Sequence, residues 1–172
     1  MKRVMALGLM LAGSLSMPVM AQGSLKLEWK NPDKFRDIRP ANQSRQSFRE
    51  EVFSQLQKYI ELRLVNRLAD GFSLHLTVTD LDLAGEVWPA MMVGLNGGSD
   101  VRLIKQIDSP RMAFDFQLLD ASGQVVLEGS EDIRDMSFMD RGSLVRDTDP
   151  LRYEKNLLRG WFDKALAGYI QK

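Results

Sequence analysis

No cysteine occurs among the 172 residues of this chain, and this absence limits how the chain can be stabilised. Small exported domains with a limited apolar core commonly depend on disulfide bonds. This chain has none to form, so its fold must depend on the burial of its own apolar side chains. The segments that present an apolar face therefore decide the architecture.

The N-terminal segment has the three-part layout of a secretory signal peptide. Lys2 and Arg3 give a positive start, residues 4–15 form an uncharged and mainly apolar run, and small or apolar residues lead to Ala21. The apolar run is shorter than the roughly 20 residues that a membrane span needs. We therefore expect cleavage after Ala21, no membrane span after cleavage, and export of residues 22–172 to the periplasm.

The exported part carries little net charge. Removal of 21 residues from 172 leaves 151, a usual size for one domain. Two of the 23 basic residues and none of the 23 acidic ones leave with the signal peptide, so the net charge becomes −2 with His75 neutral. A near-neutral chain lacks the basic surface that binds nucleic acid or anionic lipid. We expect a single domain over residues 22–172 with no nucleic-acid partner.

The order of apolar patterns predicts an α+β fold. Period-two alternation indicates strands over residues 25–29, 72–83, 101–107, 112–118 and 124–133, the last two joined by a turn that ends at Gly123. Helical spacing of apolar residues covers 44–68 and the segment after Pro150. This pattern predicts an antiparallel sheet of about four to five strands with two amphipathic helices packed on one face, in the order β-α-β-β-β-β-α.

The last helix is expected to begin with Asp149 as its N-cap and Pro150 as its first residue. Trp161 and Phe162 lie on its apolar stripe together with Leu158. We therefore expect both aromatic side chains to be largely buried against the sheet.

The strand over residues 72–83 changes phase along its length. Leu76 and Val78 share one face, and the same parity places Asp80 and Asp82 on that face. A β-bulge would explain the change, as would a pair with one of the arginines of the preceding loop and helix, Arg36, Arg39, Arg45 and Arg49. A third interpretation is a Ca²⁺ or Mg²⁺ site that includes Glu86.

No catalytic motif accompanies the polar residues of the chain. His75 is the only histidine, and neither Gly-x-Ser-x-Gly nor His-x-x-x-His is present. The methionine pairs of the sequence show no repeated spacing of the kind that would indicate a copper site. We assign no catalytic residue and no metal ligand, and we expect no cofactor.

The segment from Gly85 to Gly98 is both apolar and rich in glycine. It contains Trp88, Met91 and Met92. Such a loop can fold back as a lid over the core or form a contact surface. The lid is the expected arrangement, because exposed apolar patches are uncommon on monomers.

Four segments in order resemble an uncharacterised exported family of Gram-negative bacteria, domain of unknown function 3016. They are residues 37–41 followed by Arg45 and Phe48, residues 78–85, residues 110–112 with 118–123, and residues 151–155 with 161–162. The resemblance extends from about Leu25 to Phe162. It implies export and one domain, and it implies no activity.

These observations favour a non-enzymatic periplasmic domain that binds another envelope protein. The candidate binding residues are Asp80, Asp82, Arg39, Arg45 and Trp88. The alternative is a carboxylate-dependent hydrolase, or a carrier of a metal or small ligand, that uses Asp80, Asp82 and Glu86. The sequence alone does not indicate an oligomeric state.

Overall fold

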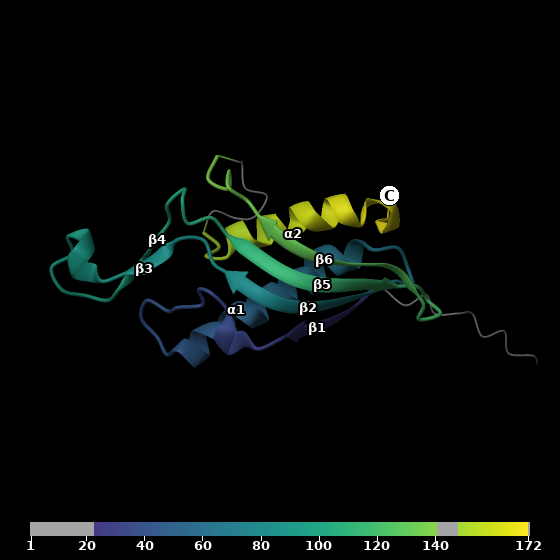
Figure 1. Cartoon of the computed structure of the whole chain (residues 1–172), viewed down its shortest axis with the longest axis horizontal. Helices are drawn as coiled ribbons and strands as arrows, with labels where there is room; N and C mark the ends of the chain where they lie inside the picture. The colour runs from purple at the N-terminus through teal and green to yellow at the C-terminus, as the bar shows by residue number, and fades with distance from the viewer. Residues whose placement is uncertain (1–22, 141–147, 172) are drawn as a thin grey trace, which may run out of the picture.

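The computed structural model describes residues 23–140 and 148–171, and Figure 1 shows the arrangement of its elements. The expected signal peptide, with its cleavage site after Ala21, lies outside the described residues. Of the helices in the described ranges, none is both long enough and apolar enough to cross a membrane.

A four-stranded sheet forms the centre of the fold. Its strands are β1 (Ser24–Trp29), β2 (Ser73–Asp82), β5 (Arg111–Leu119) and β6 (Val125–Arg134), in the spatial order β1-β2-β5-β6. The predicted α+β class is confirmed. The sheet differs from the prediction in one pair, because β1 and β2 run parallel while the other neighbours run antiparallel. The helical segment between them returns the chain to the end at which β1 began, so β2 must run in the same direction.

The first helix, α1 (Arg45–Tyr59), begins after Ser44, whose Oγ accepts the backbone N–H of Ser47 at 3.1 Å. It continues through a π-helical turn at Ile60–Leu64 and a 3₁₀ turn at Val65–Arg67. A separate 3₁₀ turn, Pro32–Lys34, lies between β1 and α1.

The last helix, α2 (Arg152–Ala165), begins later than predicted and is followed by a 3₁₀ turn at Ala167–Tyr169. The Asp149 side chain accepts the N–H of Leu151 at 2.9 Å, so Asp149 closes the turn before the helix and is not its N-cap.

Both helices contribute to one core on one face of the sheet. Alternate residues of β2 and β5 are buried with apolar side chains of α1 and α2 in a single cluster, which includes Leu56, Leu64, Leu74, Leu76, Phe114, Leu118 and Leu158. Trp161 is 7% exposed and Phe162 is 0% exposed, which confirms the predicted burial.

A second, two-stranded sheet extends from the end of the first. It pairs β3 (Glu86–Trp88) with β4 (Val101–Leu103), and the 3₁₀ turn Ala90–Val93 lies between them. We call residues 86–103 the arm, and Figure 1 shows it projecting away from the helices and the large sheet. In the described part of the chain, five strands rather than the predicted four lie between α1 and α2, because the structure adds the short strand β3, which pairs with β4. The strand predicted over 101–107 ends at Leu103, since a turn joins Lys105 to Asp108.

Candidate functional site

The tip of the arm exposes its apolar side chains. Met91 is 80% exposed, Met92 67% and Leu95 48%. No charged residue occurs from residue 87 to residue 99. The expectation that this loop covers the core is wrong. The pairing of β3 with β4 directs the chain away from the core face before the methionines are reached, so they cannot fold back over it.

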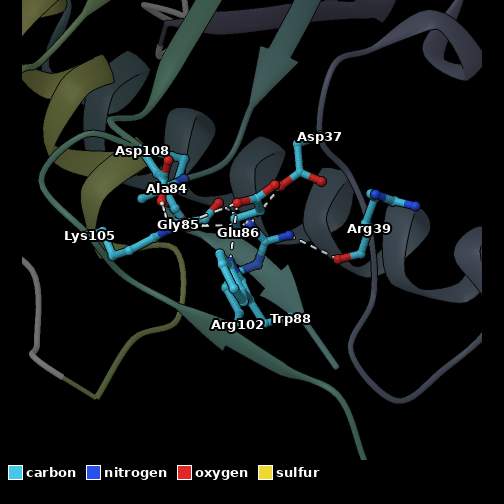
Figure 2. Close-up of polar contacts among 10 residues, drawn as sticks. Asp37, Arg39, Ala84, Gly85, Glu86, Trp88, Arg102, Lys105 and Asp108 are labelled. Atoms are coloured by element: carbon cyan, nitrogen blue, oxygen red, sulfur yellow. Dashed lines mark hydrogen bonds and ion pairs between the residues drawn. The ribbon is translucent and has the colours of Figure 1, made fainter. Parts of the chain in front are cut away.

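Arg102 of β4 fixes the root of the arm, as Figure 2 shows. Its Nη1 donates to the Asp37 carboxylate at 2.8 Å and to the carbonyl oxygen of Gly85 at 2.8 Å. Its Nη2 donates to the carbonyl oxygen of Arg39 at 2.9 Å. The side chains of Arg102 and Asp37 are only 19% and 17% exposed, so the ion pair is largely shielded from water. One guanidinium thus joins the arm to the loop before α1.

Glu154 of α2 holds the same root from the other side. Its Oε1 accepts the backbone N–H of Ala84 at 2.7 Å, and the residue is 1% exposed. Burial raises the pKa of the Glu154 carboxyl, while the Ala84 hydrogen bond and the charges of Arg102 and Lys155 act in the opposite direction. Its Oε2 is buried and has no hydrogen-bond partner among the residues that the structure describes. A helix of the core therefore determines where the arm leaves the body.

Trp88 and Lys105 strengthen the beginning of the arm. The Trp88 Nε1 donates to Glu86 at 3.1 Å, and the Lys105 Nζ lies 4.6 Å from the centre of the Trp88 ring. Lys105 also lies 3.3 Å from the carboxylate of Asp108. The ammonium group of Lys105, which follows β4, thus makes a cation–π contact with the indole of Trp88 on β3. The arm is ordered at its root and presents free apolar side chains only at its tip.

A cleft of about 310 Å³ opens beside this root. It is lined by Arg36, Asp37, Arg39, Asp82, Leu83, Gly85, Glu86, Ile107, Asp108, Ser109 and Arg134. The structure therefore brings Asp82, Arg39 and Glu86 together. Burial raises the pKa of Asp82, and the neighbouring carboxylate of Asp37 raises it further, while Arg36 lowers it. The cleft combines acidic and basic groups, and several of them pair with residues outside its lining, as Asp37 does with Arg102 and Asp108 does with Lys105.

A β-bulge accounts for the phase change in β2. The register with β5 shifts between Val78 and Asp80, so Leu81 continues the buried face at 1% exposure. Asp80 and Asp82 consequently lie on the opposite face. The extra residue of the bulge reverses the alternation, so these two carboxylates do not point inward as strict period-two counting predicts.

Asp80 also makes the predicted contact with an arginine. Its carboxylate lies 3.4 Å from Arg36 Nε and accepts the Arg36 backbone N–H at 3.1 Å. Arg111 of β5 lies 3.3 Å away on the other side. The Arg36 side chain is 58% exposed, so this contact is a partly solvated tie between the loop and β2 rather than a buried pair.

The remaining predicted residues lie elsewhere. Arg45 is the first residue of α1 and lines a small hollow that shares Arg36 and Arg39 with the cleft, and Trp88 lies on the arm. His75 lines a shallow hollow on the open face of the sheet that shares no residue with the cleft beside Asp82. Within residues 23–140 and 148–171, no three His, Cys, Asp or Glu side chains come together in a way that could hold a metal ion.

The two residues that fix the arm, Arg102 and Glu154, were not predicted. Glu154 carries a signal that could have identified it, because it follows Leu151 by three positions and precedes Leu158 by four, on the apolar stripe of α2. A carboxylate on such a stripe requires a buried partner. For Arg102 the sequence offers no comparable signal, since it lies in a short segment of alternating polarity.

Comparison with known proteins adds a family. The family model described as protein of unknown function (DUF3016) matches residues 23–164. No curated protein is significantly similar to the chain. Since the match covers well over half of the chain, the chain belongs to this family of proteins of unknown function, DUF3016.

Proposed function

We propose that the chain is exported to the periplasm and acts there as a non-enzymatic interaction domain, whose arm tip docks into an apolar groove of another envelope protein. One observation carries the proposal: Met91 and Met92 are 80% and 67% exposed at the end of an arm whose root is fixed by Arg102. Exposed apolar patches of this kind commonly mark interaction sites.

The fixed root and the free tip have different roles in binding. A contact element that is already ordered loses little conformational entropy when it binds. Methionine side chains are flexible and polarisable, so they fill apolar grooves of irregular shape. Arg102 and Glu154 supply the order, and Met91 and Met92 supply the contact.

The absence of basic residues at the tip favours a protein partner over a lipid surface. Segments that bind in a membrane interface usually carry Lys or Arg beside their apolar residues. Residues 87–99 carry none, and the nearest basic side chains, Arg102 and Lys105, are held in contacts at the root.

Site-specific photo-crosslinking in cells that produce the full precursor tests this proposal. A photoreactive residue at Met91 should give an adduct with one envelope protein. The same residue at Gln57, which is exposed on α1, is the matched control and should give none. Adducts with lipid alone, or equal adducts from both positions, would contradict the proposal.

Export is tested separately by N-terminal sequencing of the protein released by osmotic shock. The expected first residue is Gln22. Protein that retains Met1 and stays in the cytoplasm would remove the periplasmic part of the proposal.

A second candidate function is a carboxylate-dependent hydrolase, or a metal or small-ligand carrier, in the cleft beside the root. The raised pKa of Asp82 favours it, since perturbed carboxyls are common in active sites. Its other acid, Asp80, is tied to Arg36 and Arg111. Hydrolysis of ester or phosphodiester substrates that disappears in Asp82→Asn would support this candidate against the interaction domain.

A further inference from the structure

A further hollow, the groove, lies on the far side of the fold from the sheet pair β1–β2, between the outer edge of β6 and helix α2. Figure 1 shows α2 beside β6 along this border. The groove has a volume of about 630 Å³. It is lined by Glu131, Asp132, Ile133, Arg134 and Asp135 from β6 and its end, and by Asn156, Leu157, Gly160, Trp161, Lys164 and Ala165 from α2.

One wall of the groove is an unpaired strand edge. β6 has 10 residues, and within residues 23–140 and 148–171 its only strand partner is β5. Every second residue of its outer edge therefore presents a backbone N–H and C=O that no neighbouring strand in this part of the chain satisfies. Such an edge is a template for the addition of another strand.

The other wall is a helix face with a gap in its middle. Leu157, Gly160, Trp161 and Lys164 recur at helical spacing and face the groove. A Cβ at Gly160 would meet no atom within 4 Å. The absence of a side chain there leaves room for a peptide backbone between α2 and β6.

A buried donor in this wall lacks an acceptor. Trp161 is 7% exposed, yet its Nε1 has no hydrogen-bond partner among the described residues. Its ring is held edge-to-face against Phe114 and Phe116, with centroids 4.7 and 5.2 Å away, so the indole cannot turn to find one. A buried unpaired N–H carries a free-energy cost that an incoming acceptor would remove.

From this geometry we infer a peptide-binding site: an extended segment of a partner protein adds to the free edge of β6 and places an oxygen acceptor on Trp161 Nε1. This site is distinct from the arm, and the inference does not depend on the arm's function. The peptide backbone pairs with β6, and an apolar side chain of the peptide rests on Leu157 beside Gly160.

The charge of β6 indicates the chemistry of the segment. Glu128 and Glu131 outnumber Arg134 on this strand, while its third acid, Asp132, is already paired with Arg111 of β5. Two copies of β6 placed edge to edge would bring like charges together, which is unfavourable. A strand that alternates apolar residues with Lys or Arg would instead complement it.

The experiment uses random dodecapeptides displayed on phage, selected against the full exported chain, residues 22–172. The selected peptides should be enriched in alternating apolar and basic residues. Gly160→Leu fills the groove on an exposed helix position and should raise the Kd of a selected synthetic peptide by about tenfold or more. The variant should still fold, because leucine favours a helix more than glycine does.

Gly168→Leu is the matched control, since Gly168 also has open space around its Cα and does not line the groove. Its Kd should equal that of the unchanged protein. A failure to select any peptide, or equal weakening by both variants, would overturn the inference.

The indole resonances give an independent readout. On addition of the peptide, the Nε1–H signal of Trp161 should move downfield as it gains an acceptor. The Trp88 indole already donates to Glu86 and should not move. Trp161→Phe should lose this indole signal and bind the peptide with a higher Kd, while the protein remains folded. A Trp161 signal that shifts with protein concentration alone would identify a second copy as the occupant and would overturn the peptide inference.

Discussion

The large sheet and the arm place their apolar side chains in opposite environments. In the large sheet, Phe114 and Leu118 are 2% and 0% exposed against the helices. In the arm, Met91 and Met92 are 80% and 67% exposed. The apolar residues of the large sheet stabilise the fold, whereas those at the arm tip contribute little to it.

The boundary between the two regions is polar and buried. Arg102 and Glu154 join the arm to the loop before α1 and to α2. Substitutions in the core, at this boundary and at the tip should therefore have decreasing effects on stability, and that order can be tested.

The largest effect is expected in the core. Phe162 is 0% exposed, so Phe162→Ala should lower the free energy of unfolding by about 3–5 kcal/mol, because it leaves a cavity beneath the large sheet. Urea unfolding followed by circular dichroism measures it. A midpoint equal to that of the unchanged protein would show that α2 does not support the large sheet as described.

The next effect is expected at the boundary. Arg102→Ala removes the donors to Asp37, Gly85 and Arg39 and leaves a largely buried carboxylate unpaired. The expected loss is about 2–3 kcal/mol in the free energy of unfolding. Limited proteolysis should in addition cut the arm faster than the body. Arg102→Lys keeps the charge but not the forked geometry and should restore only part of the loss. Equal proteolysis rates for all three proteins would mean that the clamp does not hold the arm.

A smaller, pH-dependent effect is expected from Glu154. Its pKa is raised above the ordinary 4.5, so the folded protein holds this proton more tightly than the unfolded chain does. The contribution of Glu154 to the free energy of unfolding is therefore complete below its ordinary pKa. It decreases as the pH rises from that value through the raised pKa of the folded protein. The slope cannot exceed about 1.4 kcal/mol per pH unit for one proton.

Unfolding measured across that window should show a flatter pH profile for Glu154→Gln. The pKa of Asp82 is also raised, so the part of the pH dependence that comes from Asp82 should remain in Glu154→Gln. Glu50→Gln, on the exposed side of α1, is the control and should leave the profile unchanged. Identical profiles for Glu154→Gln and the unchanged protein would contradict the assignment.

The smallest effect on stability is expected at the tip. Met91→Ser with Met92→Ser should change the free energy of unfolding by less than about 0.5 kcal/mol, because both side chains are already in water. Binding of the proposed partner should nevertheless be lost, as measured by co-purification of the crosslinked protein identified from Met91. A loss of stability as large as that of Arg102→Ala would mean that the tip supports the fold, and the large sheet and the arm would then not differ in this respect.

The sequence predicted the elements in which an apolar pattern repeats several times. The stripe of α1, the alternation in β5 and the burial of Trp161 and Phe162 follow from local spacing, because one element repeats its apolar face over several turns or residues. The phase change in β2 was also visible, and one of its interpretations, a bulge, is present together with the predicted contact between Asp80 and Arg36.

Of the candidate site, the sequence determined the residue types but not their grouping. It singled out Asp82, Arg39 and Glu86, which meet in one cleft, and also Arg45 and Trp88, which do not line it. Spacing along the chain carries no information on which loops meet across the end of a sheet.

By itself, the sequence determined an α+β chain without cysteine, an apolar face on each helix and an uncharged apolar segment between residues 87 and 99. Only the tertiary structure decided that this segment projects as an arm, that β1 runs parallel to β2, and that Arg102 and Glu154 hold the arm's root. The physical reason is the range of the interactions. Periodic burial is set by neighbours a few residues apart, whereas the bond from Glu154 to Ala84 joins positions 70 residues apart and forms only when the core has placed them together.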